Sequence, residues 1–497
     1  MRRKRLRATA AAVCTLAAAV CALAAAGPAP AALPGPAKAS ASPALARLMD
    51  AAGRSLLAHH VRGPGGGWAW RSVIQAPDLQ TDRDVGAASV IIGLLDLYGI
   101  RRDPRYLAGA RAAGDWLLAV AQRTGHGLRW PDFHDPGGKV SSTHFTSFDD
   151  GAAGIADALW RLGQATGSAR YRRTARGALR WLEHRASAPP GASCPAGRCR
   201  WAYDDSGDAA PGYRTGIGEG NSGTIYALDV FAQRTGDRRY ETYALAGARY
   251  LERLIARIGA MPWGAGREHY FLGFLAGSTG CAYTFLRLYE HTHDPRWLRD
   301  AQRLLAFVRS RAQPDRGGLR WPITFDPTDP GLTDVQYATG IEEGAAGVGW
   351  VELQAYHLTH DPVDLQTAIG AGNWLLASAL PERGGLAWPE DLGADVVHTS
   401  LDNGAPGIGW FLDDLARETG DARFATAAQG AVTWLSAVAG RDRRGVVWFE
   451  NRTRGRWSLP GDPSWHWGLA GIAAFLARMD GLGVDSPGEE PGLPSAG

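Results

Sequence analysis

This 497-residue sequence lacks the features that mark several common classes of protein. Only five residues are cysteine, and charge is nearly balanced, with 53 Lys and Arg against 50 Asp and Glu. That balance argues against a nucleic-acid partner, because nucleic-acid binding requires a strongly positive surface. Beyond residue 26 no stretch is apolar enough to span a membrane, and no linker divides the interior. We therefore expect one large domain that acts as a monomer outside the membrane.

The N-terminus has the pattern of an export signal. Five basic side chains within the first seven residues precede an Ala-, Leu- and Val-rich run, and small residues offer cleavage after Ala26, Ala31 or Ala39. We expect residues 1–39 to be a signal peptide with a Pro/Ala-rich leader, and residues 40–480 to be the folded domain. Residues 481–497 are rich in Pro, Gly and Glu and are expected to be a disordered tail. The mature protein is then secreted.

The few cysteines agree with export. Two of the five leave with the signal, and Cys194 and Cys199 flank a four-residue turn. Outside the cell a local disulfide between these two residues is expected. Cys281 lies in an apolar segment, where a buried thiol acts as a small apolar side chain.

The abundant feature of the sequence is repetition. An acidic or polar residue, then Gly-x-x-Gly or Gly-x-x-Ser, then an apolar run occurs seven times, at intervals of roughly sixty to seventy residues. The seven segments are 84–94, 149–159, 218–228, 275–285, 342–353, 402–412 and 466–476. Repeats of this size are supersecondary units that must stack to bury their apolar faces.

Each repeat predicts two helices and an extended arm. The apolar run is too long for a strand and indicates a buried inner helix. An amphipathic outer helix such as 105–122 follows a polar turn, and a Gly-rich turn with Trp closes the repeat, as in 127–131. Asp caps begin the outer helices. These caps are Asp103, Asp237, Asp294, Asp361 and Asp421. Most of the 19 tryptophans recur at equivalent points and are expected to be packing anchors.

The two ends of the repeat series predict a closed ring. The last inner helix, 466–480, has no outer helix after it, whereas a lone helix, 44–60, precedes the first inner helix. We therefore predict an all-α fold, an α/α toroid or barrel of about seven helical hairpins with short extended arms. Helix 44–60 closes the ring by serving as the missing outer helix.

Acidic residues precede most of the inner helices, whose starts share one end of such a toroid. An acid at a helix N-terminus also has a purely structural use. Several acids around one cavity raise one another's pKa, however, and this favours a functional mouth. The candidate catalytic residues are Glu343, Asp402, Asp150, Glu219 and His466. The candidate substrate-binding residues are Asp149, Glu342, Asn403, Trp467, Trp465, His398, Tyr337 and His269.

The Gly-x-x-Gly inner helices, with GAPGIGWFL at 404–412 and a His-Trp pair before Gly468, resemble the lanthionine synthetase C-like family over residues 44–480. The resemblance implies an α/α toroid. In the family's cyclases, a zinc ion at the mouth activates a peptide cysteine, which adds to a dehydrated Ser or Thr. Their ligands are one Cys in W-C-Y-G-x-P-G and a Cys-His pair in C-H-G.

This chain departs from the family pattern at each of those positions. Asp402 stands at the first cysteine, His466 and Trp467 stand at the Cys-His pair, and Glu343 stands at the acid/base histidine. Thiolates hold zinc far better than a single carboxylate and imidazole do. We expect no cofactor. A metal bound by Asp402, His466 and His398 is the alternative.

Three functions, with catalysis itself left open, agree with the sequence. The first is a secreted lanthionine synthetase C-like protein that binds or modifies a peptide in an acidic mouth. The second is a carbohydrate-active enzyme, a glycoside hydrolase, lyase or epimerase, with Glu343 as acid and Asp402 or Asp150 as base. The third is a non-catalytic module that binds a small molecule or glycan. A terpene cyclase is disfavoured, because the Gln/Trp repeats of that group are not evident.

Overall fold

The computed structural model describes residues 43–72, 78–135, 137–205, 212–255, 257–264, 269–327, 336–449, 451–457 and 461–481. The signal peptide and leader predicted for 1–39, and the tail predicted for 481–497 apart from Gly481, lie outside these residues. From Ala41 onward the chain clusters as one unit. Within the described ranges, none of the helices is both long enough and apolar enough to cross a bilayer.

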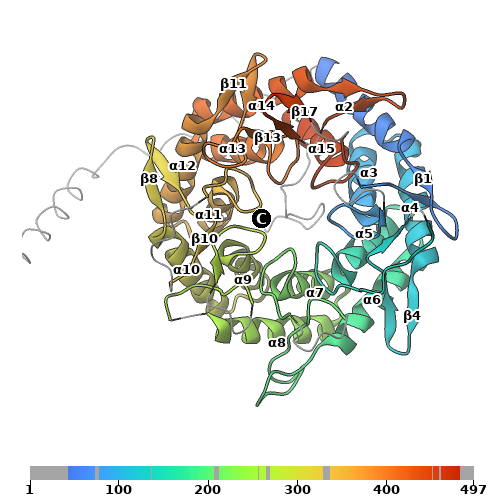
Figure 1. The fold of residues 1–497 in the computed structure, drawn as a ribbon. Helices are drawn as coiled ribbons and strands as arrows, with labels where there is room; N and C mark the ends of the chain where they lie inside the picture. Colours follow the sequence, from blue (N-terminus) through green and yellow to red (C-terminus); the bar gives the residue numbers. More distant parts are fainter. Residues whose placement is uncertain are drawn as a thin grey trace, which may run out of the picture. The chain divides into compact units, whose positions relative to one another are not determined.

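The helices of this unit form two concentric rings, as Figure 1 shows. The inner helices are α3 (Ala87–Arg101), α5 (Ala152–Ala165), α7 (Asn221–Thr235), α9 (Ser278–Thr292), α11 (Ala345–Thr359), α13 (Ala405–Thr419) and α15 (Leu469–Met479). The outer helices are α2 (Pro43–Ala58), α4 (Pro104–Val120), α6 (Ala169–Arg185), α8 (Arg238–Leu254), α10 (Pro295–Ser310), α12 (Pro362–Ser378) and α14 (Ala422–Val438). The prediction of an α/α toroid is confirmed.

The two ends of the repeat series meet, as the sequence predicted. Each inner helix packs against the outer helix of its own repeat, and α15, which has no outer helix after it, packs against α2. The inner helix α15 also contacts both α13 and α3, so the inner ring is continuous. The N-terminal helix therefore completes the seventh hairpin.

Short antiparallel hairpins form the arms between repeats. The hairpin strands are β1 (Val61–Arg62), β2 (Trp68–Ala69), β4 (Gln122–Thr124), β5 (Gly127–Arg129), β8 (Gln313–Asp315), β9 (Gly318–Arg320), β11 (Leu380–Glu382), β12 (Gly385–Ala387), β14 (Gly440–Arg441) and β15 (Val446–Val447). The other strands are β3 (Leu79–Gln80), β6 (Phe133–His134), β7 (Tyr270–Phe271), β10 (Thr324–Phe325), β13 (Val396–His398), β16 (Asn451–Thr453) and β17 (Arg456–Trp457). These pair as β3–β6, β7–β10 and β13–β16–β17.

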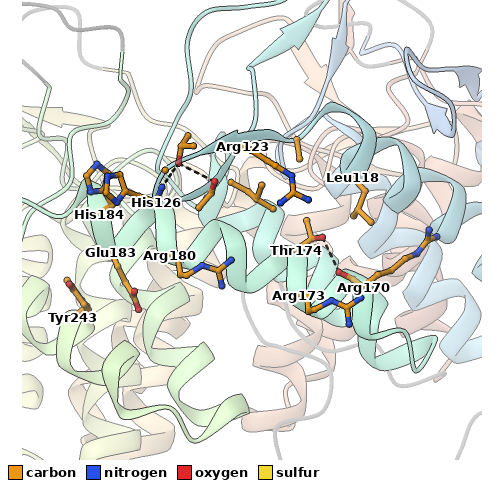
Figure 2. Close-up of a pocket in the computed structure, with 15 residues that line it drawn as sticks. Leu118, Arg123, His126, Arg170, Arg173, Thr174, Arg180, Glu183, His184 and Tyr243 are labelled. Atoms are coloured by element: carbon orange, nitrogen blue, oxygen red, sulfur yellow. Dashed lines mark hydrogen bonds between the residues drawn. The ribbon is translucent and has the colours of Figure 1, made fainter.

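Each hairpin lies against the outer helix of the next repeat. Strand β5 contacts α6, β9 contacts α12, and β12 contacts α14. Figure 2 shows β4–β5 running along α6. Strand β15, in the hairpin after α14, contacts α2 in the same way. This contact again gives α2 the place of an outer helix in the seventh repeat.

A buried tryptophan fastens most arms to the outer helix before them. The indole N–H donates to a helix carbonyl 2.7 to 2.9 Å away. The six tryptophans are Trp70, Trp130, Trp201, Trp321, Trp388 and Trp448. All six side chains are buried, so their prediction as packing anchors is confirmed. The five predicted Asp caps likewise accept a backbone N–H at the start of their helices.

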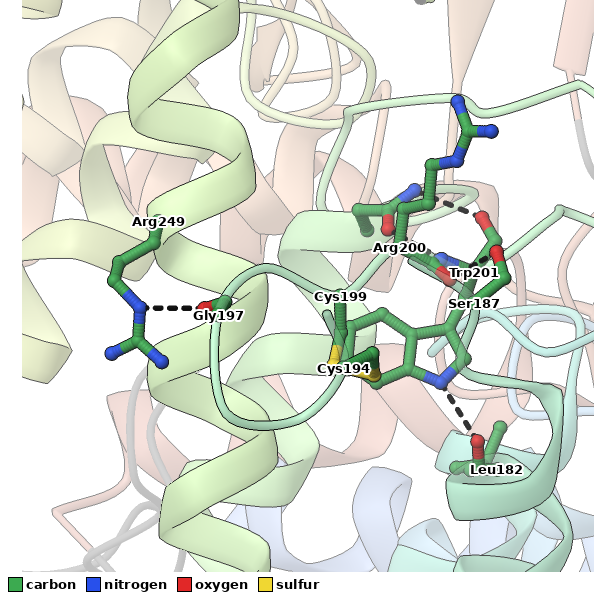
Figure 3. Close-up of a disulfide and its surroundings, with 9 residues drawn as sticks. Leu182, Ser187, Cys194, Gly197, Cys199, Arg200, Trp201 and Arg249 are labelled. Atoms are coloured by element: carbon green, nitrogen blue, oxygen red, sulfur yellow. Dashed lines mark hydrogen bonds between the residues drawn. A yellow bond between two sulfur atoms is a disulfide. The ribbon is translucent and has the colours of Figure 1, made fainter. Parts of the chain in front are cut away.

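The structure joins Cys194 and Cys199 in a disulfide, as Figure 3 shows. The small loop that it closes is held against α8, because the guanidinium of Arg249 donates to the carbonyl of Gly197 at 2.7 Å and the N–H of Cys199 donates to the carbonyl of Ala246 at 3.0 Å. Cys281 is buried in α9, where burial raises the pKa of its thiol to about 12.

The second glycine of each Gly-x-x-Gly has a packing cause. In six repeats a Cβ at this glycine would lie only 1.8 to 1.9 Å from a backbone oxygen of the preceding loop; for Gly407 the clash is with the carbonyl oxygen of Leu401, at 1.9 Å. The first repeat has Ser89 instead, and its hydroxyl accepts the N–H of Trp465 at 2.8 Å. Inner helices thus begin in contact with their own entry loops, which fixes where the loop side chains point.

We expect Gly407→Ala to destabilise the protein by about 3 kcal/mol, because its methyl group overlaps a backbone oxygen that cannot move freely. Gly99→Ala is the matched control: Gly99 is exposed within α3 and a Cβ there meets nothing, so we expect a gain of about 0.5–1 kcal/mol. Denaturant unfolding of both variants checks this pair. Equal stabilities would contradict the close approach.

Candidate functional site

The loops before the inner helices are linked into a ring by backbone hydrogen bonds. At five junctions among the described loops, two successive N–H groups of one loop donate to a single carbonyl of the next loop. The N–H groups of Ile341 and Glu342, for example, donate to the carbonyl of Asp402 at 2.7 and 3.2 Å. Those of Arg83 and Asp84 donate to the carbonyl of Asp149 at 2.8 and 3.2 Å. This pattern holds equivalent residues of different repeats at equivalent points around the axis.

The residues three before each first glycine form the floor of a central cavity of about 50 Å³. All seven of them line it: Arg83, Phe148, Ile217, Phe274, Ile341, Leu401 and Trp465. Residues two before the glycine add a polar rim of Asp149, Glu342, Asp402 and His466, together with Leu275. Five candidate residues from four repeats, Trp465 among them, therefore meet at this cavity.

His466 is held between a carboxylate and a guanidinium. Its Nδ1 lies 3.0 Å from Oδ1 of Asp402, and its Nε2 lies 3.0 Å from Nη1 of Arg83. A guanidinium can only donate, so Nε2 must accept, and the ring proton must be on Nδ1 toward Asp402. Asp402 and Arg83 therefore orient the imidazole and leave its Nε2 as the acceptor, beside another residue that lines the cavity.

Arg83 is the one charged residue of the floor, and sequence reasoning missed it. Its Nη1 lies 3.4 Å from Oδ1 of Asp149, and its guanidinium stacks over the ring of Phe148 at 4.4 Å. Its side chain is only 9% exposed. Aligning the seven loops one residue further upstream would have found it, because the other six positions are apolar.

The pKa values of two carboxyl groups of the rim, those of Glu342 and Asp149, are raised. Burial raises the pKa of Glu342 well above its ordinary value, and the charge of Asp402 raises it further. Burial also raises the pKa of Asp149, and the positive charge of Arg83 opposes this rise. Asn403 donates to Oε2 of Glu342 at 2.7 Å. The rim therefore combines the ion pair of Asp149 with Arg83 and a second carboxyl group, that of Glu342, whose neutral form is favoured by burial.

Asp150 and Glu219 form a separate cluster and do not line the central cavity. Tyr203 donates to Oδ2 of Asp150 at 3.0 Å, and burial, followed by the charge of Asp149, raises the pKa of Asp150 well above its usual value. Glu219 pairs with Arg214, whose guanidinium lies 3.9 Å from the centre of the Tyr203 ring.

Glu343 also lies outside the lining of the cavity, and it joins two repeats. Its Oε1 accepts the N–H of Ala276 at 2.8 Å. Burial raises the pKa of Glu343 to about 8, a hydrogen bond from Ala276 opposes this, and Glu219 adds a smaller rise. The acid that faces the cavity is its neighbour Glu342.

Three candidate binding residues lie at other contacts. His398, in β13, has Nε2 3.4 Å from Oε2 of Glu390. Tyr337 donates to Gln313 of β8 at 2.8 Å. His269 packs edge-on against Phe271 at 5.0 Å. None of the three is among the cavity-lining residues of the described chain, and each stands further before its first glycine than the floor and rim residues do.

The predicted ligand set Asp402, His466 and His398 is not brought together. Among the described residues, Asp84 takes the place of His398: possible ligand atoms of Asp84, Asp402 and His466 lie within 4.8 Å of one another. Trp467 donates to Oδ1 of Asp84 at 2.8 Å. These residues do not fit the zinc site of the family, because they offer no thiolate and Arg83 already donates to Nε2 of His466.

Comparison with known proteins identifies the family of this chain. The family model described as "Lanthionine synthetase C-like protein" matches residues 216–481, more than half of the chain. The chain belongs to the lanthionine synthetase C-like family. No curated protein matches it in sequence.

Solved structures share the fold of this family member at low identity. Nisin cyclase has a TM-score of 0.55 and 12% identity, covering 81% of this chain and 89% of its own. A D-mannose isomerase has a TM-score of 0.50 and 16% identity, with 71% and 91% coverage. A sugar epimerase from a ruminal bacterium has a TM-score of 0.50 and 13% identity, with 88% and 100% coverage. At these identities the likeness concerns the fold alone.

We expect Arg83→Gln to increase zinc affinity about tenfold or more. The substitution removes a positive charge, which would repel zinc, from beside the possible ligands Asp84, Asp402 and His466. Calorimetric titration with zinc, compared between wild type and variant, measures this. Adding His466→Gln to the variant should abolish the gain. Tight one-to-one zinc binding by the wild type would contradict the argument.

The raised pKa of Glu343 predicts a pH-dependent stability. Between its ordinary value of 4.5 and about 8, the unfolded chain loses the proton while the folded chain keeps it, so this residue makes the fold less stable as pH rises. Glu343→Gln keeps the oxygen that accepts from Ala276. We therefore expect the variant to gain stability over wild type from pH 5 to pH 8, measured by urea unfolding. A constant difference across this range would count against the shift.

Proposed function

We propose that this family member is an exported, metal-independent enzyme that transfers protons on a neutral, hydroxylated ligand of the sugar class. One observation carries the proposal: the His466 imidazole, oriented by Asp402, faces a cavity that is also lined by the carboxyl of Glu342. An oriented base opposite a protonated acid is the arrangement that general acid–base catalysis requires.

The composition of the cavity supports a neutral ligand. Arg83 and Asp149 form an ion pair whose charges offset each other, and the raised pKa of Glu342 favours its neutral form. The walls include the aromatic side chains of Phe148, Phe274 and others. Hydrogen-bonding groups beside flat apolar faces suit a sugar, whereas a strongly charged ligand would lack a counter-charge. A cavity of about 50 Å³ admits only the reacting end of such a ligand.

The reaction that we propose is a proton transfer between the ligand, His466 and Glu342. A C–H beside the ligand's carbonyl gives its proton to Nε2 of His466, and the electron pair moves to the carbonyl oxygen, which takes the proton of Glu342. Arg83, released from Nε2, donates to a ligand oxygen. Return of the proton to the neighbouring carbon, with Glu342 reprotonated by a ligand hydroxyl, gives an isomer. Return to the same carbon gives an epimer when the planar intermediate has first turned its other face to His466. Atoms and charges balance without a cofactor.

The names of two fold relatives support this class of reaction, since one is a D-mannose isomerase and the other a sugar epimerase. The hydrolase alternative, with Glu343 as acid and Asp402 or Asp150 as base, has less support, because Glu343 and Asp150 are engaged with Ala276 and Tyr203 away from the cavity.

A peptide ligand is the second candidate, and membership of the lanthionine synthetase C-like family favours it. The family match includes Glu342, Asp402 and His466. The same base could take a proton from a peptide thiol that adds to a dehydrated residue. The absence of thiolate ligands from the rim is the reason that we place this candidate second.

Deuterium exchange tests the proposal directly. The mature chain is incubated in D₂O with a panel of reducing mono- and disaccharides, and label at the carbon beside the carbonyl is measured by NMR. We expect wild type to incorporate deuterium, and His466→Gln and Asp402→Asn to lose about 10²-fold or more in rate, because the base is removed or its tautomer is no longer held.

The exposed variant Glu418→Gln should exchange like wild type. Absence of exchange with every sugar, together with ring closure of a peptide that carries dehydroalanine and cysteine, would replace this proposal with the peptide candidate. Shortened glycan products that disappear in Glu343→Gln would instead support the hydrolase arrangement.

A further inference from the structure

A basic groove lies on the outer surface of the second repeat, away from the central cavity. It has a volume of about 1020 Å³ and is lined by the β4–β5 hairpin, by α6 and by Tyr243 of α8. Figure 2 shows four arginines around it: Arg123 of β4, and Arg170, Arg173 and Arg180 of α6. We refer to it as the hairpin groove.

Positive charge dominates this groove. All four arginines are exposed, and Glu183 is the only acid among the lining residues. Arg170 pairs with Asp115, whereas the other three arginines are not in any ion pair described within the structure. Six of the chain's 53 Lys and Arg lie in residues 1–39, which hold no acid, so the rest of the chain is slightly negative. The groove is therefore a local reversal of charge that the overall composition hides.

The repeat provides internal controls for these arginines. In the same packing, Gly177 of α6 lies on Leu128 of β5, Gly430 of α14 on Leu386 of β12, and Gly370 of α12 on Leu319 of β9. The groove beside α14 has about 850 Å³. In each helix we compare the residue four positions before this glycine with the residue three positions after it. These two residues are Arg173 and Arg180 in α6, Thr426 and Thr433 in α14, and Gln366 and Asn373 in α12.

Packing of hairpin on helix therefore needs no arginine at either position. The scaffold forms the groove with threonine or amide side chains as well. We infer that the arginines have a use outside the fold, because a pair of exposed guanidinium groups suits the bidentate binding of an anion.

The spacing of the cations favours a sparsely charged polymer. Seven residues separate Arg173 from Arg180, a rise of about 10 Å along the helix, whereas phosphates of a nucleic-acid strand repeat about every 3.4 Å. At the end of the groove His126 and His184 stack with ring centres 3.6 Å apart and planes 12° from parallel. This flat face is suited to a sugar ring.

We propose that the hairpin groove binds a carboxylate-bearing polysaccharide, with Arg123, Arg173 and Arg180 pairing with its acidic groups and the His126–His184 face contacting its rings. The groove would hold an anionic glycan at a surface remote from the central cavity. The inference does not depend on the proton-transfer chemistry proposed for the cavity.

The test is binding of a hyaluronan oligosaccharide, which carries one carboxylate on every second sugar, measured by calorimetry at 50 and 200 mM NaCl, with its methyl ester as the uncharged ligand. Wild type should bind the acid form, more weakly at the higher salt, and not the ester. Arg173→Thr with Arg180→Thr installs the residues of the α14 groove. We expect about tenfold weaker binding for this double variant.

The matched control is Arg238→Thr with Arg299→Thr, which removes the same charge from exposed positions on α8 and α10. This control should bind like wild type, and thermal unfolding should show that both double variants remain folded. Equal weakening in the two double variants would overturn the proposal, since bulk charge would then account for binding. So would failure of wild type to bind the acid form, or tighter binding of an oligothymidylate of the same length.

Discussion

The contact on which the site depends is the close approach of each inner helix to its own entry loop. A second glycine without a Cβ lets the helix backbone meet the loop carbonyl, as at Gly407 and Leu401. The loops then bond to one another through paired N–H groups around the axis. Because the same backbone geometry recurs, residues three and two before the first glycine form the floor and the rim of one cavity.

Because of that geometry, the position of a residue relative to the first glycine decides whether it lies in the floor or in the rim of the cavity. Six floor positions are apolar or aromatic and exclude water, while the rim carries carboxyl groups and an imidazole. Arg83 interrupts the floor and lies between His466 and Asp149. A permanent cation at this point compensates a ring of acids that would otherwise repel one another, and in family members with thiolate ligands a zinc ion serves at the mouth.

On the outer face of the ring, too, one packing arrangement is repeated while the exposed residues differ. One hairpin-on-helix packing, with a glycine beneath a leucine, recurs beside α6, α12 and α14. The packing residues are constant, whereas the groove-facing residues vary from arginine to glutamine to threonine. A repeat protein can therefore differentiate its surfaces without disturbing its core, since the residues that face solvent contribute little to packing.

The sequence alone determined the architecture, because glycine spacing, helix caps and apolar runs are local signals that repeat along the chain. The unpaired end helices 44–60 and 466–480 even indicated ring closure. The repeat pattern also predicted that Asp149, Glu342, Asp402 and His466 lie at one mouth of the ring. Local signals could not separate residues that differ by one position, so Glu343 was preferred to Glu342 and Arg83 was missed. Only the tertiary structure decided which side chains face the axis and that His398 lies elsewhere, because these depend on hydrogen bonds between loops of different repeats, distant from one another in the sequence.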